Sequence, residues 1–114
     1  DTKTLVTSND STLTSLMAPS FAKAAGAANV STQPWTTGAE DFSFFGEKAP
    51  ALFFNLGGMP KGMDPAKAPG HHTPEFAIDD SQLDVGVKAF CYLVLDYASQ
   101  HAKMKPAVGA KKAF

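Results

Sequence analysis

Two adjacent histidines are the first candidates for chemistry in this 114-residue sequence. His71 and His72 precede Thr73-Pro74, and a proline pushes the residue before it into an extended conformation. Adjacent side chains of an extended segment point in opposite directions, so one of the two is expected to face a given site. An imidazole held in this way suits metal binding or proton transfer. A structural role for both histidines is the alternative.

A pair of acidic residues is the second candidate. Glu40 and Asp41 follow Gly38 and precede a cluster of phenylalanines. Acidic side chains are favoured at helix N-termini, so the simplest interpretation is that the pair caps a short helical turn. The alternative is chemical, because a carboxylate here can bind a metal ion, act as a general base, or orient a metal ligand.

The third candidate is a pair of glycines. Gly57 and Gly58 follow an apolar run at 51–56, which predicts a strand buried on both faces. Glycines at the end of a strand let the main chain approach a ligand, and ligands of open α/β sheets lie at the carboxyl ends of strands. A flexible turn explains the same residues without any ligand.

Two amphipathic helices are predicted to frame these groups. The first begins after Ser8-Asn9-Asp10, whose side chains suit an N-cap, and ends at Gly26, with a kink expected at Pro19. The second opens at Asp80-Ser81, where Ser81 and Asp84 have the spacing of a capping box, and runs to about His101. Its predicted apolar stripe consists of Leu83, Val87, Phe90, Val94, Tyr97 and His101.

The order of helix, strand, loop and helix predicts an α/β fold. Short strands are also expected near 4–8 and 29–33, and 103–114 is expected to be a flexible tail because it lacks periodicity. One central strand cannot form a sheet that is covered on both faces. The chain is therefore expected to be incomplete as a free-standing α/β domain.

Composition and charge exclude several classes of protein. The chain is 44% hydrophobic and 18% charged with a formal net charge of −1, so nothing draws it generally to nucleic acid or to an anionic membrane. No apolar run reaches the ~20 residues of a membrane span. Cys91 is the single cysteine, which excludes an internal disulfide, and it is expected to be buried in the second helix. All ten basic residues are lysines, so no guanidinium is present to hold a carboxylate.

Taken in order, these groups resemble the C-terminal portion of metal-dependent amidohydrolases and peptidases of the M20 family. The resemblance is closest to the branch of aminoacylase-, hippurate hydrolase- and auxin-conjugate hydrolase-like enzymes, and it covers about residues 5–98. The matching stretches are Val6–Asp10, Thr37–Phe45, Leu52–Gly58 and His71–Asp79, followed by the long helix.

The resemblance implies an enzyme that cleaves the amide bond of N-acyl amino acids or small peptides. Water activated by divalent metal, expected to be two zinc ions per active site, would be the nucleophile. Residues 1–8 are implied to be the last strand and hinge of a lid, or dimerisation, domain, and 9–102 the C-terminal part of the catalytic domain. His72 is implied to be a metal ligand, and the residues implied to lie beside the site are Glu40, Asp41, Gly57, Gly58 and His71.

The other metal ligands of the family, and the Glu-Glu pair that supplies its catalytic base, have no counterpart in this sequence. Because a zinc site needs three or four protein ligands, the isolated chain is predicted to be inactive and to bind little metal. The expected partners are the rest of the catalytic domain, a small N-acyl amino acid or peptide substrate, and further copies in a homo-oligomer. The alternatives are a non-enzymatic module that self-associates through exposed apolar faces, and an unrelated small α/β domain with structural histidines.

Overall fold

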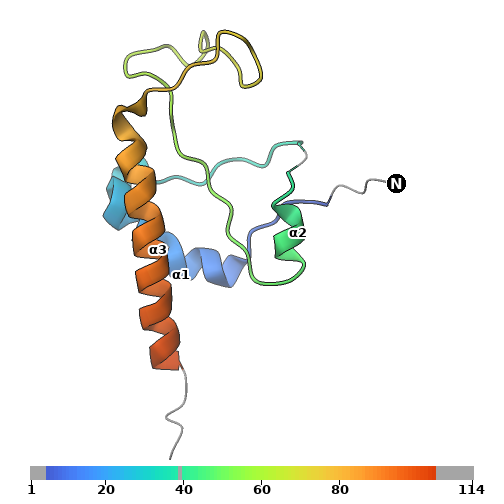
Figure 1. Cartoon of the computed structure of the whole chain (residues 1–114), viewed down its shortest axis with the longest axis vertical. Coiled ribbons are helices and arrows are strands. Elements are labelled where there is room, and N and C mark those ends of the chain that lie inside the picture. Colours follow the sequence, from blue (N-terminus) through green and yellow to red (C-terminus); the bar gives the residue numbers. More distant parts are fainter. Residues whose placement is uncertain (1–4, 39, 105–114) are drawn as a thin grey trace, which may run out of the picture.

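The computed structural model describes residues 5–38 and 40–104 of the chain. Two long helices, α1 and α3, cross one another, and long connecting segments extend from them (Figure 1). The helical elements are α1 (Ser11–Ala25), η1 (Ala27–Asn29), α2 (Ser43–Gly46), η2 (Asp80–Gln82) and α3 (Leu83–Met104), where η marks a 3₁₀ turn. None of the helices in the described ranges is long and apolar enough to cross a bilayer.

The predicted α/β fold is wrong, because the described residues form helices and connecting segments without a β-strand. The apolar run 51–56 was expected to be the central strand, but it crosses the molecule unpaired. A strand needs a neighbour that exchanges main-chain hydrogen bonds with it over several residues, and no described segment does so. The strands expected near 4–8 and 29–33 are likewise not formed within the part described.

Helix α1 confirms the first predicted helix and both of its ends. Asp10 is the N-cap, and its Oδ1 accepts a hydrogen bond from the main-chain N–H of Leu13 at 2.7 Å. Gly26 ends the helix with a φ of 83° and donates its N–H to the carbonyl of Ala22. Pro19 lies inside the helix and leaves the carbonyl four residues earlier without its usual donor.

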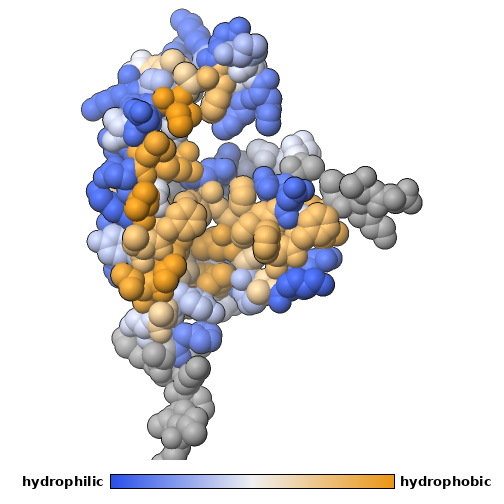
Figure 2. Space-filling model, viewed as in Figure 1, coloured by the Kyte–Doolittle hydropathy of each residue, from blue (hydrophilic) through white to orange (hydrophobic). Residues whose placement is uncertain are grey.

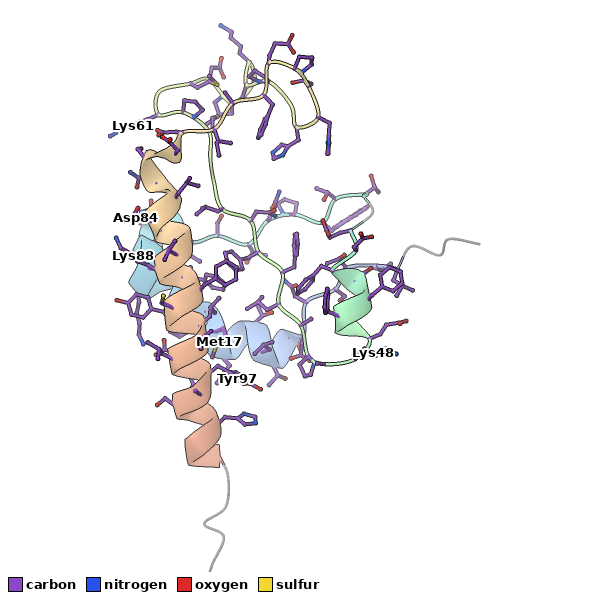
Figure 3. The ribbon with its side chains drawn as sticks, in the orientation of Figure 1. Met17, Lys48, Lys61, Asp84, Lys88 and Tyr97 are labelled. Atoms are coloured by element: carbon purple, nitrogen blue, oxygen red, sulfur yellow. The ribbon has the colours of Figure 1, made fainter. Side chains whose placement is uncertain are left out.

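Helices α1 and α3 are held together by a small apolar contact and a polar cluster. Met17 of α1 lies near the crossing of the two helices (Figure 3), and it is buried, as is Ala89 of α3. Beside them, the buried Ser20 Oγ donates to Asp96 Oδ2 at 2.7 Å, and Lys23 Nζ lies 2.9 and 2.7 Å from the two carboxylate oxygens. The hydrogen bonds from Lys23 and then from Ser20 lower the pKa of Asp96.

This cluster predicts an acid-sensitive contribution to stability. Because the pKa of Asp96 is lowered on folding, its contribution is present above the unfolded-state value of about 3.9 and is lost as the pH falls through the lower folded-state value. Asp96→Asn is expected to lower the thermal unfolding midpoint at neutral pH, and the gap to wild type should close below about pH 3.9. A gap of constant size across that range would contradict the prediction. Asp64→Asn is the control, because the Lys67–Asp64 pair is exposed and 3.9 Å apart.

Helix α3 packs with a different face from the one predicted. The buried and half-buried positions along its described side chains are Val85, Gly86, Ala89, Leu93, Asp96 and Gln100. The predicted stripe lies one residue further along, about 100° around the helix, and is exposed, with Val87 at 64% and Val94 at 66%. Apolar residues therefore surround much of the helix, which is typical of a helix buried on several sides. Cys91 is also exposed, so its predicted burial is wrong.

The unpaired run 51–56 nevertheless contacts helices on both of its sides. Phe54 lies between Phe21 of α1 and Phe90 of α3, with ring centroids 4.8 and 5.2 Å away. Its neighbour Phe53 contacts Phe42, just before α2, at 5.3 Å. Apolar side chains consequently form a broad surface along α3 and across the middle of the molecule (Figure 2).

Two boundary predictions are only partly within the described residues. Of the predicted lid strand and hinge at 1–8, residues 1–4 lie outside the described range. Helix α3 continues to Met104, past its predicted end near His101, while most of the predicted tail, residues 105–114, is outside the description.

Candidate metal centre

The two histidines lie on a long loop with a closed base. We call residues 59–78 the histidine loop; it projects beyond the start of α3 (Figure 1). At its base the carbonyl of Gly58 accepts a hydrogen bond from the N–H of Asp79 at 2.8 Å. Asp79 also accepts a hydrogen bond from the N–H of Ser81 at 2.9 Å and so caps the turn that leads into α3. The loop therefore leaves and returns at one fixed point.

The histidine segment is a turn, so the prediction of an extended segment is wrong. His72 has a φ of 66°, the left-handed value, and it is the one non-glycine residue with a positive φ in the described part of the chain. The carbonyl of Thr73 accepts from the N–H of Phe76 at 3.1 Å, which places Pro74 at the second position of a β-turn, where its fixed φ is favoured. The constraint from proline acts on Thr73 and leaves the preceding residue to turn.

The two histidines have different surroundings. The His71 ring packs on the Phe76 ring with their centroids 4.6 Å apart. His72 is exposed, and its left-handed backbone costs on the order of 1 kcal/mol in a non-glycine residue. Histidine is among the residues that adopt this conformation more often than most.

The acidic pair belongs to a tight turn that leads into α2. Glu40 Oε1 accepts from the N–H of Phe42 at 3.3 Å, and the Glu40 carbonyl accepts from the Ser43 hydroxyl at 2.7 Å. The Asp41 carbonyl accepts from the N–H of Phe44 at 3.1 Å. Both acidic residues are exposed. The Glu40 side chain thus serves the local turn, but α2 receives no hydrogen bond from a side-chain cap, so the expected capping of the helix is not observed.

The two glycines at the end of the 51–56 run differ in what surrounds them. A Cβ added to Gly57 would meet nothing within 4 Å, whereas one on Gly58 would lie 3.1 Å from Ile78 Cγ2. Gly58 therefore has a packing reason to lack a side chain, because a Cβ would press on Ile78 at the base of the histidine loop. Gly57 borders a hollow of about 380 Å³ that Lys61 and Asp79 also line (Lys61 in Figure 3).

The described residues do not form a complete metal centre. No group of three or more His, Cys, Asp or Glu side chains in the described ranges lies close enough together to hold an ion. An exposed imidazole on a loop with a fixed base suits one ligand position, and a zinc site needs three or four. The described residues alone therefore could not enclose a zinc ion.

Asn9 and Lys61 were missed by reasoning from the sequence. Asn9 was grouped with the N-cap of α1, but its side chain bonds to Phe53, 44 positions along the chain. Lys61 lies in a loop without periodicity, where it lines the same hollow as Gly57 and Asp79. Neither arrangement has a local signal, because Asn9 bonds to a distant segment and the hollow includes Asp79, eighteen positions beyond Lys61.

A single match to a known protein family covers all of these candidate residues. The sequence model of peptidase family M20/M25/M40 matches residues 2–96, a stretch that includes the histidine loop, the acidic turn and both glycines. No solved structure gives a significant match to the chain. The family match confirms the resemblance to M20 enzymes at the level of the family and indicates a hydrolase. The chain belongs to peptidase family M20/M25/M40.

Proposed function

We propose that this chain is the C-terminal part of a metal-dependent amidohydrolase that cleaves N-acyl amino acids or small peptides. The observation that carries the proposal is the family match over residues 2–96, which includes the histidine loop. We call the longer polypeptide, with the rest of the catalytic domain, the parent protein. In it, His72 would be one ligand of a centre of two zinc ions, and His71, held against Phe76, its neighbour.

Each candidate residue has a limited role in this proposal. Bound metal would polarise the amide carbonyl and lower the pKa of a bound water. Of the chain's own residues, His72 would contribute one imidazole to the centre, and Gly57, which is open on its side-chain face, would let the main chain approach the substrate. Glu40 and Asp41 would border the site, with Glu40 holding the turn before α2. Gly58 would fix the base of the histidine loop.

The exposed face of α3 supports the rest of the catalytic domain as a partner. Large apolar side chains that should be buried lie open along this face, including Val87, Phe90 and Val94, each more than 60% exposed. Contiguous apolar patches that are exposed on a protein surface mark interaction sites. We propose that the preceding part of the parent protein covers this face and supplies the remaining metal ligands.

A second candidate function rests on the same face. In a chain without such a covering, the α3 stripe would favour association of two copies, and the chain would be a self-associating module and not part of an enzyme. This alternative needs neither an amide substrate nor zinc, which are parts of the first proposal, as is the homo-oligomer expected of the parent protein.

The proposal predicts a metal-dependent activity that needs more than this chain. The purified parent protein is expected to hydrolyse N-acetyl amino acids, to lose this activity on treatment with a chelator, and to regain it when zinc is added. The isolated chain is expected to be inactive under all three conditions, because no three of its described side chains form the group of ligands that a zinc site needs. Chelator-resistant hydrolysis by the parent, or chelator-sensitive hydrolysis by the isolated chain, would contradict the proposal.

A further inference from the structure

Asn9 makes an unusual pair of hydrogen bonds. Its Nδ2 donates to the carbonyl of Phe53 at 2.8 Å, and its Oδ1 accepts from the N–H of Phe53 at 2.7 Å. Two opposite residues of an antiparallel ladder exchange the same two bonds through their main chains. Here one side-chain amide takes the place of a neighbouring strand.

The next residue extends this contact. The N–H of Asp10 donates to the carbonyl of Ala51 at 2.9 Å, while the Asp10 side chain caps α1. Asn9 and Asp10 therefore bond to alternate residues, Phe53 and Ala51, of the segment 51–58, which is the run 51–56 with the two glycines that follow it. A slip of one residue would break all three bonds, so the contact fixes the register of the run against the start of α1.

Only a side-chain amide of this length can bond to both the carbonyl and the N–H of Phe53. Aspartate has no donor, and it would place a negative charge against the Phe53 carbonyl. Serine can replace at most one of the two bonds, and alanine neither. Glutamine has one more methylene group and does not fit the same spacing.

The fixed run leads directly to the base of the histidine loop. After Phe53, the Phe54 ring lies between α1 and α3. Leu56 then lies so close to α3 that a Cβ on Gly86 would be 2.9 Å from Leu56 Cδ2. Gly58 follows and bonds to Asp79. The chain is thus held at several points between Asn9 and the loop.

We propose that Asn9 is a positioning residue for the histidine loop: by locking the register of 51–58, it sets the base of the loop and the place of His72. This inference rests on the proposed role of His72 as a metal ligand. Asn9 itself touches neither the histidines nor the hollow beside Gly57.

The test uses Asn9→Asp and Asn9→Ser in the parent protein. The first readout, in zinc-free protein, is hydrogen exchange of the Asp79 amide, whose bond to Gly58 closes the loop. The second is the Kd for zinc of the folded protein, measured by competition with a chelator. Asn9→Asp is expected to speed this exchange and to raise the Kd about tenfold, at the lower end of the 10- to 100-fold seen when supports of a metal ligand are lost. Asn9→Ser should lie between Asn9→Asp and wild type.

Asn29→Ala is the matched control. Asn29 is also exposed, and its Nδ2 donates to the Ala25 carbonyl at 2.8 Å, at the opposite end of α1. This variant is expected to leave both readouts at wild-type values. The inference is overturned if an Asn9 variant that folds has a lower melting temperature but a zinc Kd within twofold of wild type. The zinc Kd of His72→Gly is measured in the same way. If this variant also keeps the wild-type zinc Kd, the proposed role of His72 as a metal ligand fails. If it loses zinc while the Asn9 variants keep the wild-type Kd, only the positioning role of Asn9 is rejected.

Discussion

His72→Ala in the parent protein is expected to lower amide hydrolysis by more than about 100-fold, beyond the loss usual for residues that merely support a ligand. The same variant should lose part of its bound zinc, because one imidazole of the centre is gone. Hydrolysis rates with added zinc and the metal content of the purified protein measure the two effects.

The left-handed backbone of His72 makes the choice of variant important. At a φ of 66°, alanine bears backbone strain on the order of 1 kcal/mol and adopts this conformation less readily than histidine does. His72→Gly removes this strain together with the imidazole. If ligand loss is the cause, the glycine and alanine variants should be equally inactive. Activity restored by glycine would show that the backbone, and not the imidazole, is what the site requires.

His71→Ala is the second control for this prediction. His71 packs on Phe76 within the loop and is proposed only as a neighbour of the site. Its removal is expected to lower activity by no more than about tenfold and to leave the metal content unchanged. Equal losses for both histidines would contradict the assignment of His72 alone.

Val87→Glu combined with Val94→Glu should severely destabilise the parent protein. The two valines are 64% and 66% exposed in this chain, and the proposal places them under the rest of the catalytic domain. Two unpaired carboxylates there would cost several kcal/mol, which is a large part of the stability of a typical domain. Soluble yield and the thermal unfolding midpoint measure the effect.

Ser99→Glu is the matched control, because Ser99 is an exposed polar residue of α3 outside the apolar stripe. It is expected to change the midpoint little. If the valine double variant is as stable as wild type, the stripe is not covered in the parent protein. If it stays stable but dissociates an oligomer in light scattering, a second copy covers the stripe and the alternative function gains support.

The ends of the helices could be predicted from the sequence because their signals are local. Asp10 and Gly26 mark the ends of α1 as expected. The start of α3 lies within a few residues of its predicted place, although Asp79 caps the preceding turn where Ser81 was expected to cap the helix. Cap residues bond to groups three or four positions away, so one short stretch of sequence specifies them.

The fold class and the packed face of α3 could not be predicted, because they depend on partners. The run 51–56 has the composition of a buried strand, yet a strand forms only where another segment pairs with it. Its hydrogen bonds come instead from Asn9 and Asp10, through contacts that no periodicity announces. On α3 two apolar faces lie side by side, and the hydrophobic pattern does not say which one meets α1.

The residues proposed for the site could be chosen from the sequence, whereas their geometry could not be foreseen. The histidines, the acidic pair and the glycines all fall within the family match. The backbone of His72 was not foreseen, because the rule for residues before proline restrains Thr73 and has no force one position earlier. The difference between Gly57 and Gly58 depends on Ile78, which lies twenty positions further along the chain.

The closed base of the histidine loop also bears on how such enzymes can diverge. The entropy needed to join the ends of a loop rises slowly with length, by about 0.6 kcal/mol for each doubling. With Gly58 and Asp79 bonded, residues between them can be inserted or deleted without moving the chain on either side. Evolution can therefore change the length of the loop that carries the histidines while the helices beneath it stay unchanged.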